Sequence, residues 1–166
     1  MNLDRLEEVL GIQNVKGLTA VKFEGFFLNM MQLGDMDRRS LQEIPGYKEY
    51  LECARNQGAA YAILDYGQPI VCFGVVEQWP HVAECWLLPD VNKIKQWRIP
   101  FHKGSLNFME EIAKELDLHR IHVTVDAANL VALKWIRAMK FQKEGLLKSY
   151  TYDKKDMIMY SRIFAR

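Results

Sequence analysis

The order of secondary-structure signals between residues 82 and 141 constrains the fold most. An apolar, strand-like run from Val82 to Leu88 leads into a basic segment and then into a helical pattern from about Pro100 to Leu116. A second strand-like run, Arg120 to Val125, is followed by a helical pattern from Asn129 to Met139. Helices and strands that alternate in this way are typical of a sheet layered with helices.

Antiparallel strands are predicted on either side of this segment. The runs 59–66 and 69–76 flank a Gly67-Gln68 turn and predict a hairpin. A last pair of strands is expected at about 144–153 and 157–164. The predicted fold class is therefore α/β (α+β): a mixed, mostly antiparallel central sheet with helices on both faces.

The N-terminal third predicts three helices and one strand. Leucine and valine spacing predicts a helix over residues 2–10 that ends at Gly11, and a strand follows over 18–26. Asp35 is expected to cap a helix that stops at Pro45-Gly46. The last helix covers 47–56, and Gly58 is its expected terminator. We expect one domain over residues 1–166, with residues 1–17 as a helical extension.

Composition narrows the class of protein. A chain of 166 residues with 49% hydrophobic and 26% charged residues is typical of one globular domain. Its net charge of +1 argues against a nucleic-acid-coating protein. No apolar run approaches the roughly 20 residues of a membrane span, and the N-terminus lacks a signal-peptide pattern. Three cysteines, an odd number, favour a reducing compartment, and we expect a cytosolic protein.

Neither the cysteines nor the histidines of the sequence predict a metal site. The cysteines Cys53, Cys72 and Cys85 lie in apolar stretches, which favours buried small hydrophobic residues over metal ligands or disulfides. The four histidines have no ligand spacing with cysteines or carboxylates, so no metal site is predicted: His81, His102, His119 and His122.

Four local sequences carry a family resemblance. They are Gly34–Glu43, Asp65–Val75, Cys85-Trp86, and the helix that starts at Asn129-x-x-Ala132 and ends before Phe141. With the element order, they resemble the GNAT N-acetyltransferase superfamily over about residues 18–164. The similarity is greater still to GNAT-like proteins of tailed bacteriophages, some of which are internal virion proteins. Fold alone does not determine function.

The resemblance implies acetyl-CoA as co-substrate and no metal. The family signature Q/R-x-x-G-x-G/A is replaced here by residues 90–105, which are basic and contain one glycine. This segment has three possible roles. Its cationic side chains replace some of the backbone hydrogen bonds that usually bind the phosphates, or it is a solvated loop, or it binds an acidic partner. The implied cofactor-binding residues are Trp86, Leu87, Leu88, Lys95, Arg98, His102, Lys103, Gly104, Ser105 and Asn129.

The resemblance also suggests catalytic residues. Glu84, on the central strand, is the candidate base, and the alternative is a half-exposed strand residue with a basic neighbour. Ile136 stands where the family has a tyrosine acid, and Lys140 replaces a glycine. A late-strand tyrosine substitutes only if its ring reaches the cleft, and the candidates are Tyr150, Tyr152 and Tyr160. Asn129 caps a helix, contacts CoA, or does both.

Two main functional hypotheses follow from the resemblance. The first is an acetyl-CoA-dependent N-acetyltransferase acting on an unknown amine acceptor, with Asp37 and Arg38 as candidate acceptor contacts. The second is a non-enzymatic phage protein, structural, internal to the virion or bound to a host partner. A third is CoA binding without transfer. The protein is expected in the cytoplasm. If it is encoded by a phage, the expected location is the cytoplasm of the host or the virion.

Overall fold

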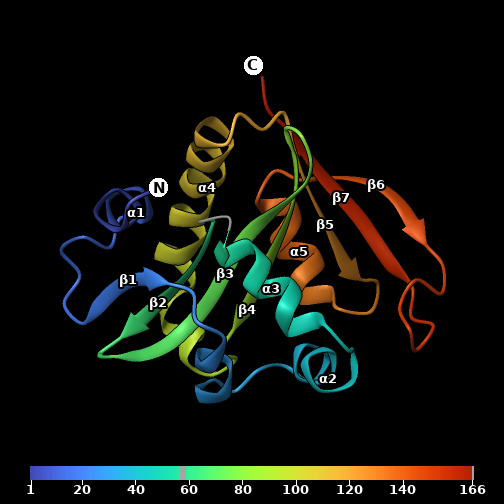
Figure 1. The fold of residues 1–166 in the computed structure, drawn as a ribbon, viewed down its shortest axis with the longest axis horizontal. Helices are drawn as coiled ribbons and strands as arrows, with labels where there is room; N and C mark the ends of the chain where they lie inside the picture. The colour runs from blue at the N-terminus through green and yellow to red at the C-terminus, as the bar shows by residue number, and fades with distance from the viewer. Residues whose placement is uncertain (57–58, 166) are drawn as a thin grey trace. The chain divides into compact units, whose positions relative to one another are not determined.

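The computed structural model describes residues 1–56 and 59–165 (Figure 1). The chain divides into two compact units. The first unit contains residues 1–76 and 86–112, and the second contains residues 77–85 and those from 113 onward. The sheet has seven strands in the order β1-β2-β3-β4-β5-β7-β6, which confirms the predicted mixed, mostly antiparallel class. The strands are β1 (Leu18–Lys22), β2 (Ala60–Asp65), β3 (Gln68–Trp79), β4 (Val82–Pro89), β5 (Arg120–Asp126), β6 (Gln142–Leu147) and β7 (Met157–Ile163).

In the first unit, β2 and β3 form the predicted hairpin, with its turn one residue earlier than expected. Asp65 pairs with Gln68, so the two-residue loop is Tyr66-Gly67 rather than Gly67-Gln68. Both loop residues have positive φ, 45° and 80°. That combination matches the twist of a hairpin and is the reason a glycine is needed at the second position.

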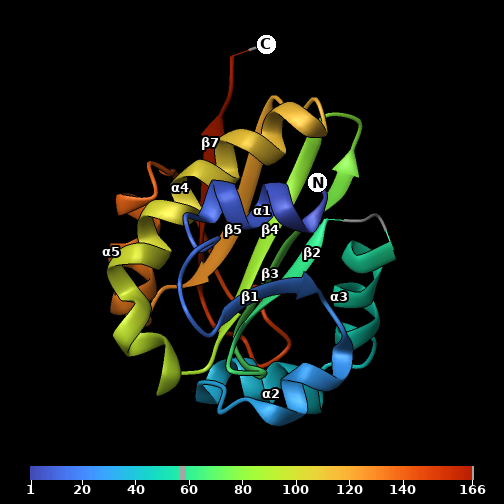
Figure 2. The ribbon, with the colours of Figure 1, turned by 90° about the vertical axis from the view of Figure 1, so that its left-hand side faces the viewer.

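Residue alternation along this hairpin separates two apolar layers of the first unit. Ala62 and Cys72 face a cluster that includes Phe23, Leu51 and Trp86. The neighbouring Tyr61 and Phe73 face the other way and contact the ring of Phe108, with ring centres 6.1 and 5.0 Å apart. Figure 2 shows the corresponding helices, α3 (Tyr47–Asn56) and α4 (Arg98–Glu115), on opposite sides of these strands.

The segment after β1 differs from the prediction. The strand ends at Lys22 instead of residue 26, and the short 3₁₀ helix η1 (Gly25–Met30) follows. The pairing of β1 with β2 ends at Lys22, and residues 25 and 26 of the predicted strand belong to η1 instead, which buries Gly25, Phe27 and Leu28.

Helix boundaries agree with the sequence more closely than helix caps do. α1 (Leu3–Leu10) is confirmed, with Asn2 accepting a hydrogen bond from the Arg5 amide and Gly11 in the left-handed conformation. For α2 (Asp35–Glu43), the predicted Asp35 cap is wrong, because Gly34 occupies the cap position and Asp35 is already helical. The expected terminator Gly58 lies outside the described residues.

The second unit contains one parallel strand pair and two antiparallel pairs. β4 and β5 run parallel, with Val82–Glu84 opposite Arg120–His122. β7 pairs antiparallel with β5 on one side and with β6 on the other. The predicted strand over 144–153 is wrong in its bounds, because β6 ends at Leu147 and residues 148–156 connect it to β7.

Two further sequence expectations have different outcomes. Cys72 and Cys85 are buried as expected, and burial raises the pKa of each thiol to about 12. Cys53 is exposed, contrary to expectation, because α3 turns Leu51 and Ala54 toward the core instead. None of the described helices is both long enough and apolar enough to cross a membrane. The single-domain interpretation of residues 1–166 stays a prediction.

Candidate functional site

In the second unit, Glu84 on β4 and His122 on β5 are direct neighbours in the sheet. They are register partners in the parallel pair, and partners of this kind project from the same face. His122 is also the register partner of Ser161 on β7, so the polar row continues from β4 across β5 to β7. The sequence analysis predicts a catalytic role for Glu84 but none for His122, which appears there only among the histidines without metal-ligand spacing. The missing information was the strand register.

A network of charged hydrogen bonds lies beside this row. The guanidinium of Arg120 donates two hydrogen bonds to the two carboxylate oxygens of Glu144, at 2.7 and 2.5 Å. The Ser161 hydroxyl donates to the same carboxylate at 2.6 Å. The hydrogen bonds from Arg120 have the largest effect, followed by that from Ser161, and together they lower the pKa of Glu144 to about 2. Glu144 is therefore an ionised structural group and not a proton carrier near neutral pH.

His122 is held in its neutral form by its surroundings. Burial is the main cause that lowers the pKa of His122, and the Arg120 charge acts in the same direction. The Glu84 and Glu144 carboxylates oppose this shift without reversing it. Its Nδ1 atom is buried and has no hydrogen-bond partner among the described residues. A neutral imidazole beside Glu84 is a group that can accept a proton.

None of the tyrosines expected as substitute acids lies on this polar row. Tyr160 lies on β7 with its ring completely buried, and its register neighbour is Val123, on the sheet face opposite to His122. Its hydroxyl accepts a hydrogen bond from Arg137 on α5 (Leu130–Ala138) at 3.2 Å. Tyr150 and Tyr152 are exposed in the β6–β7 connection, so their predicted strand positions are wrong.

Asn129 is confirmed as a helix cap. Its side-chain oxygen accepts a hydrogen bond from the Ala132 amide at 3.0 Å, at the first turn of α5. Ile136, at the family's tyrosine position, is buried on the same helix. A contact between Asn129 and CoA stays a prediction.

In the first unit, the side chains of Trp86 and Leu88 on β4 belong to the apolar core. Trp86 is 9% exposed and its ring meets that of Phe23 edge to face at 5.2 Å, while Leu88 is 2% exposed. Leu87 is half-buried. If these three residues bind the cofactor, their backbone groups make the contact. β4 runs to Pro89, whereas its parallel pairing ends at Glu84.

The basic segment is helical, contrary to the predicted loop. The 3₁₀ helix η2 covers Lys93–Trp97, and α4 begins at Arg98, two residues before the expected start. The Trp97 indole donates to the Asp65 carboxylate at 3.3 Å, and this bond fixes η2 to the hairpin. Arg98 and Lys103 are exposed and form no ion pair with a described residue. Lys95 is exposed beside Asn92, and His102 is half-buried.

Gly104 and Ser105 lie inside α4 and are both buried. A side chain on Gly104 would come within 2.6 Å of the Leu10 carbonyl oxygen, so this glycine lets α4 approach the end of α1. Amides this far into a helix donate to the preceding helical turn. Any phosphate contact from this segment is therefore best made by the exposed cations and the first turn of α4.

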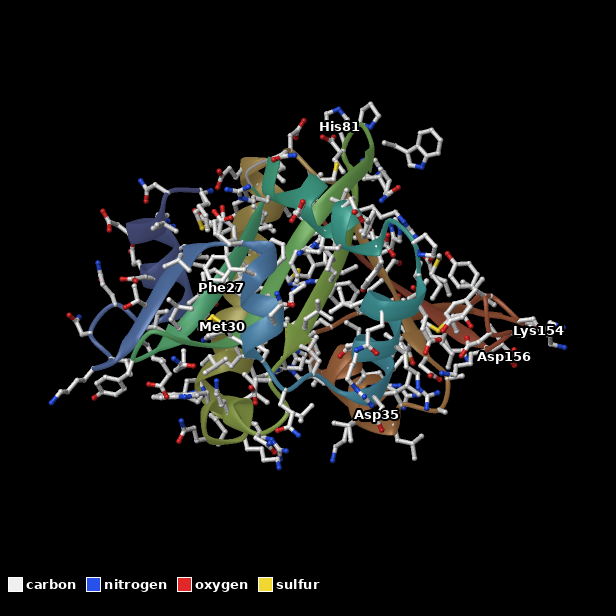
Figure 3. All side chains as sticks on the ribbon, turned by 60° about the horizontal axis from the view of Figure 1, so that its bottom comes forward. Phe27, Met30, Asp35, His81, Lys154 and Asp156 are labelled. Carbon is white, nitrogen blue, oxygen red and sulfur yellow. The ribbon has the colours of Figure 1, made fainter. Side chains whose placement is uncertain are left out.

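The first unit also contains a cavity of about 310 Å³ between η1, α2 and α3. Figure 3 labels Phe27 and Met30 on η1 and Asp35 at the start of α2, two of the elements that contribute lining residues. Arg38 lines the cavity, whereas Asp37 is half-buried one residue earlier, and burial raises the pKa of its carboxyl to about 6. The full lining is Gly25, Leu28, Asn29, Met31, Leu33, Arg38, Leu41, Gln42 and Lys48.

Comparison with solved structures identifies the fold as that of GNAT acetyltransferases. A GNAT-family acetyltransferase from Bacillus anthracis superposes with a TM-score of 0.65 at 15% identity, covering 89% of this chain and 95% of that one. Ard1 from Thermoplasma volcanium superposes with a TM-score of 0.68 at 13% identity, covering 90% and 99%. A putative acetyltransferase from Salmonella typhimurium, solved with its cofactor acetyl-CoA, superposes with a TM-score of 0.65 at 6% identity, covering 89% and 94%.

Sequence comparison gives no further assignment. No protein-family profile and no curated protein matches the chain. At identities of this size, the structural similarity shows the fold alone.

Proposed function

We propose that this chain is an acetyl-CoA-dependent N-acetyltransferase that transfers an acetyl group to the amine of an acceptor. The observation that carries the proposal is the Glu84–His122 pair on one face of a sheet with the GNAT strand order. A carboxylate beside a neutral imidazole supplies what amine acetylation needs most, an acceptor for the proton of the attacking nitrogen. The structures that share this fold include one with acetyl-CoA.

Acetyl-CoA supplies the activated acetyl group and a thiolate leaving group. In our proposal, Arg98 and Lys103 bind the phosphates, because both cations are exposed and form no ion pair with a described residue. Lys95, His102 and the first turn of α4 are their neighbours in the chain and add further contacts. Backbone groups of Trp86, Leu87 and Leu88 hold the pantetheine arm, and Asn129 adds a contact from its cap position. Gly104 and Ser105 shape α4 and bind no phosphate directly.

Glu84 is the proposed base, and the neighbouring His122 is the proposed acceptor of its proton. The position of the usual tyrosine acid holds the buried Ile136, and Tyr160 is on the opposite face of the sheet. We therefore expect the thiolate to leave with little acid assistance, at a cost of about 10²–10⁴ in rate relative to an enzyme with a positioned acid.

A second candidate is a non-enzymatic protein that uses the same fold to bind a phage or host partner, in the cytoplasm or the virion. It is favoured by the lack of a tyrosine at position 136 and by the helical structure of the segment that replaces the glycine-rich signature. CoA binding without transfer is the third candidate.

The decisive experiment measures free CoA thiol released from acetyl-CoA across a panel of small amines and N-terminal peptides. The proposal expects amine-dependent release that Glu84→Gln lowers about 10²–10⁴-fold. Glu110→Gln, a change on the exposed surface of α4, is the matched control and retains the rate. Release that is absent with every amine, or that is unchanged by Glu84→Gln, would contradict the proposal.

A further inference from the structure

One stretch of the second unit carries positive charge that its acidic side chains do not balance. Residues 130–148 contain α5, β6 and the connection between them, with five cations and one carboxylate. All five cations are exposed, and none forms an ion pair with a described residue: Lys134, Arg137, Lys140, Lys143 and Lys148. Charges of one sign gathered on a surface attract a partner of the opposite sign.

A β-bulge turns the one carboxylate of this stretch away from the cations. The pairing of β6 with β7 skips Glu144, which lies between Lys143 and Gly145 as an extra residue. The Glu144 carboxylate accepts its hydrogen bonds from Arg120 and Ser161. The acid is therefore neutralised within the sheet and does not compensate the charge of its neighbour Lys143.

Lys143 and Leu146 project from the other face of β6, the face on which α5 lies. Lys143 is the register partner of Tyr160, and Leu146 is the register partner of Ile158, two residues away on β7. The Tyr160 hydroxyl accepts a hydrogen bond from Arg137 of α5, which identifies this face as the α5 side. Leu146 is 46% exposed. The α5 side of β6 thus combines positive charge with accessible aliphatic surface.

The outer edge of β6 has backbone groups that no described strand pairs with. β6 is the last strand in the sheet order and pairs with β7 alone among the described strands (Figure 1). An open edge is a template for an added strand, and a bulge and an edge lysine both oppose pairing with a like-charged copy of the same strand. An acidic strand meets no such repulsion, and Gly145–Leu147 follow the bulge with regular pairing.

From these observations we infer that the edge of β6 and the cationic side of α5 bind an acidic segment of another protein, which adds to the sheet as a further β-strand. The backbone of Gly145–Leu147 pairs with the segment, and Lys143 and Arg137 attract its carboxylates. This interaction is independent of acetyl transfer.

A polypeptide partner is favoured over a nucleic acid for two reasons. Only a polypeptide supplies backbone N–H and C=O groups at the spacing of a strand edge. The large apolar side chains exposed on α5 and β6 are aliphatic, whereas single-stranded nucleic acids bind through aromatic stacking: Leu130, Val131 and Leu146.

Binding is tested by fluorescence anisotropy with a labelled synthetic peptide of about nine residues that alternates glutamate and valine. We expect a Kd of about 10–100 μM, which Lys143→Glu weakens by about 10-fold or more. Lys16→Glu changes an exposed cation before β1, at the opposite end of the strand order, and is the matched control. It should leave the affinity within about 2-fold of the wild type.

Backbone methylation of the peptide separates strand addition from charge attraction alone. Methyl groups on the glutamate amides and on the valine amides block opposite edges of the peptide, so one set should abolish binding and the other should not. Amide resonances of Gly145–Leu147 in the wild-type protein should shift on binding.

Four results would overturn the inference. They are no binding at about 1 mM peptide, equal affinity for a peptide with lysine in place of glutamate, equal affinity of the two methylated peptides, and tighter binding of a single-stranded oligonucleotide of the same charge.

Discussion

Two carboxyl groups, Asp37 in the first unit and Glu144 in the second, have opposite surroundings. Near the cavity of the first unit, Asp37 is half-buried, forms no hydrogen bond to a described residue, and has its pKa raised to about 6. On the sheet face of the second unit, Glu144 has two strong donors and a pKa of about 2. Burial without partners opposes ionisation, whereas preformed donors favour it. Asp37 is thus left without a hydrogen-bond donor among the described residues, whereas Glu144 is held in a fixed network.

The largest expected effect on stability comes from Asp37. Its raised pKa means that the folded state binds this proton more tightly than the unfolded state does, so stability falls as pH rises from about 4 through about 6. Asp37→Asn removes that loss and should raise the free energy of unfolding by about 1–3 kcal/mol at pH 7.5. Urea unfolding at pH 7.5 and at pH 4 measures the effect, which should nearly vanish at the lower pH.

Asp35→Asn is the matched control, because the Asp35 side chain is 84% exposed and lies two residues before Asp37 on the same helix. It should change stability by less than about 1 kcal/mol at either pH. A similar gain from both variants would show that net charge, and not burial of Asp37, is responsible.

The next effect in size breaks the network of the second unit. Arg120→Gln removes the two hydrogen bonds that the guanidinium donates to Glu144 and leaves the one from Ser161. We expect a loss of about 1–2 kcal/mol in unfolding free energy, after allowance for solvent exposure of the pair. Arg55→Gln breaks the more exposed Arg55–Glu24 pair in the first unit and should cost about 0–1 kcal/mol. Equal losses in the two variants would remove the distinction between the units.

The pH dependence of the free energy of unfolding gives a smaller test of the same network, with a predicted direction. Because its folded pKa is depressed, its contribution to stability is complete above the unfolded value of 4.5 and is lost as pH falls toward about 2. Arg120→Gln should flatten this part of the stability curve. Chemical unfolding at pH 5, 4 and 3 compares the slopes of the wild type and the variant, and parallel slopes would contradict the assignment.

The smallest effects are expected at two exposed side chains that line the cavity of the first unit. Asn29→Ala and Gln42→Ala remove side chains that hydrogen-bond to no described residue, so the free energy of unfolding should change by about 0.5 kcal/mol or less. Thermal unfolding of each variant is the measurement. A loss above about 1 kcal/mol would show that these groups support the fold.

Local periodicity in the sequence was enough to predict most helices and strands, while sites depended on register. The hairpin, α1, α3 and the strand–helix–strand–helix segment follow from residue spacing and from Gly and Asn caps. The η1 helix was missed because burying Phe27 and Leu28 together is a tertiary effect. His122 was not recognised beside Glu84 because strand register is not encoded locally. Gly104 was assigned to the cofactor because its close approach to Leu10 joins residues 94 positions apart in sequence.

The most direct test of the central claim is a calorimetric titration of the protein with acetyl-CoA. We predict micromolar binding that the double variant Arg98→Glu, Lys103→Glu weakens by about 10-fold or more, as expected for loss of two phosphate contacts. Lys114→Glu, an exposed cation farther along α4, should leave the affinity within about 2-fold of the wild type. No binding at about 1 mM acetyl-CoA, or equal weakening by Lys114→Glu, would contradict the account.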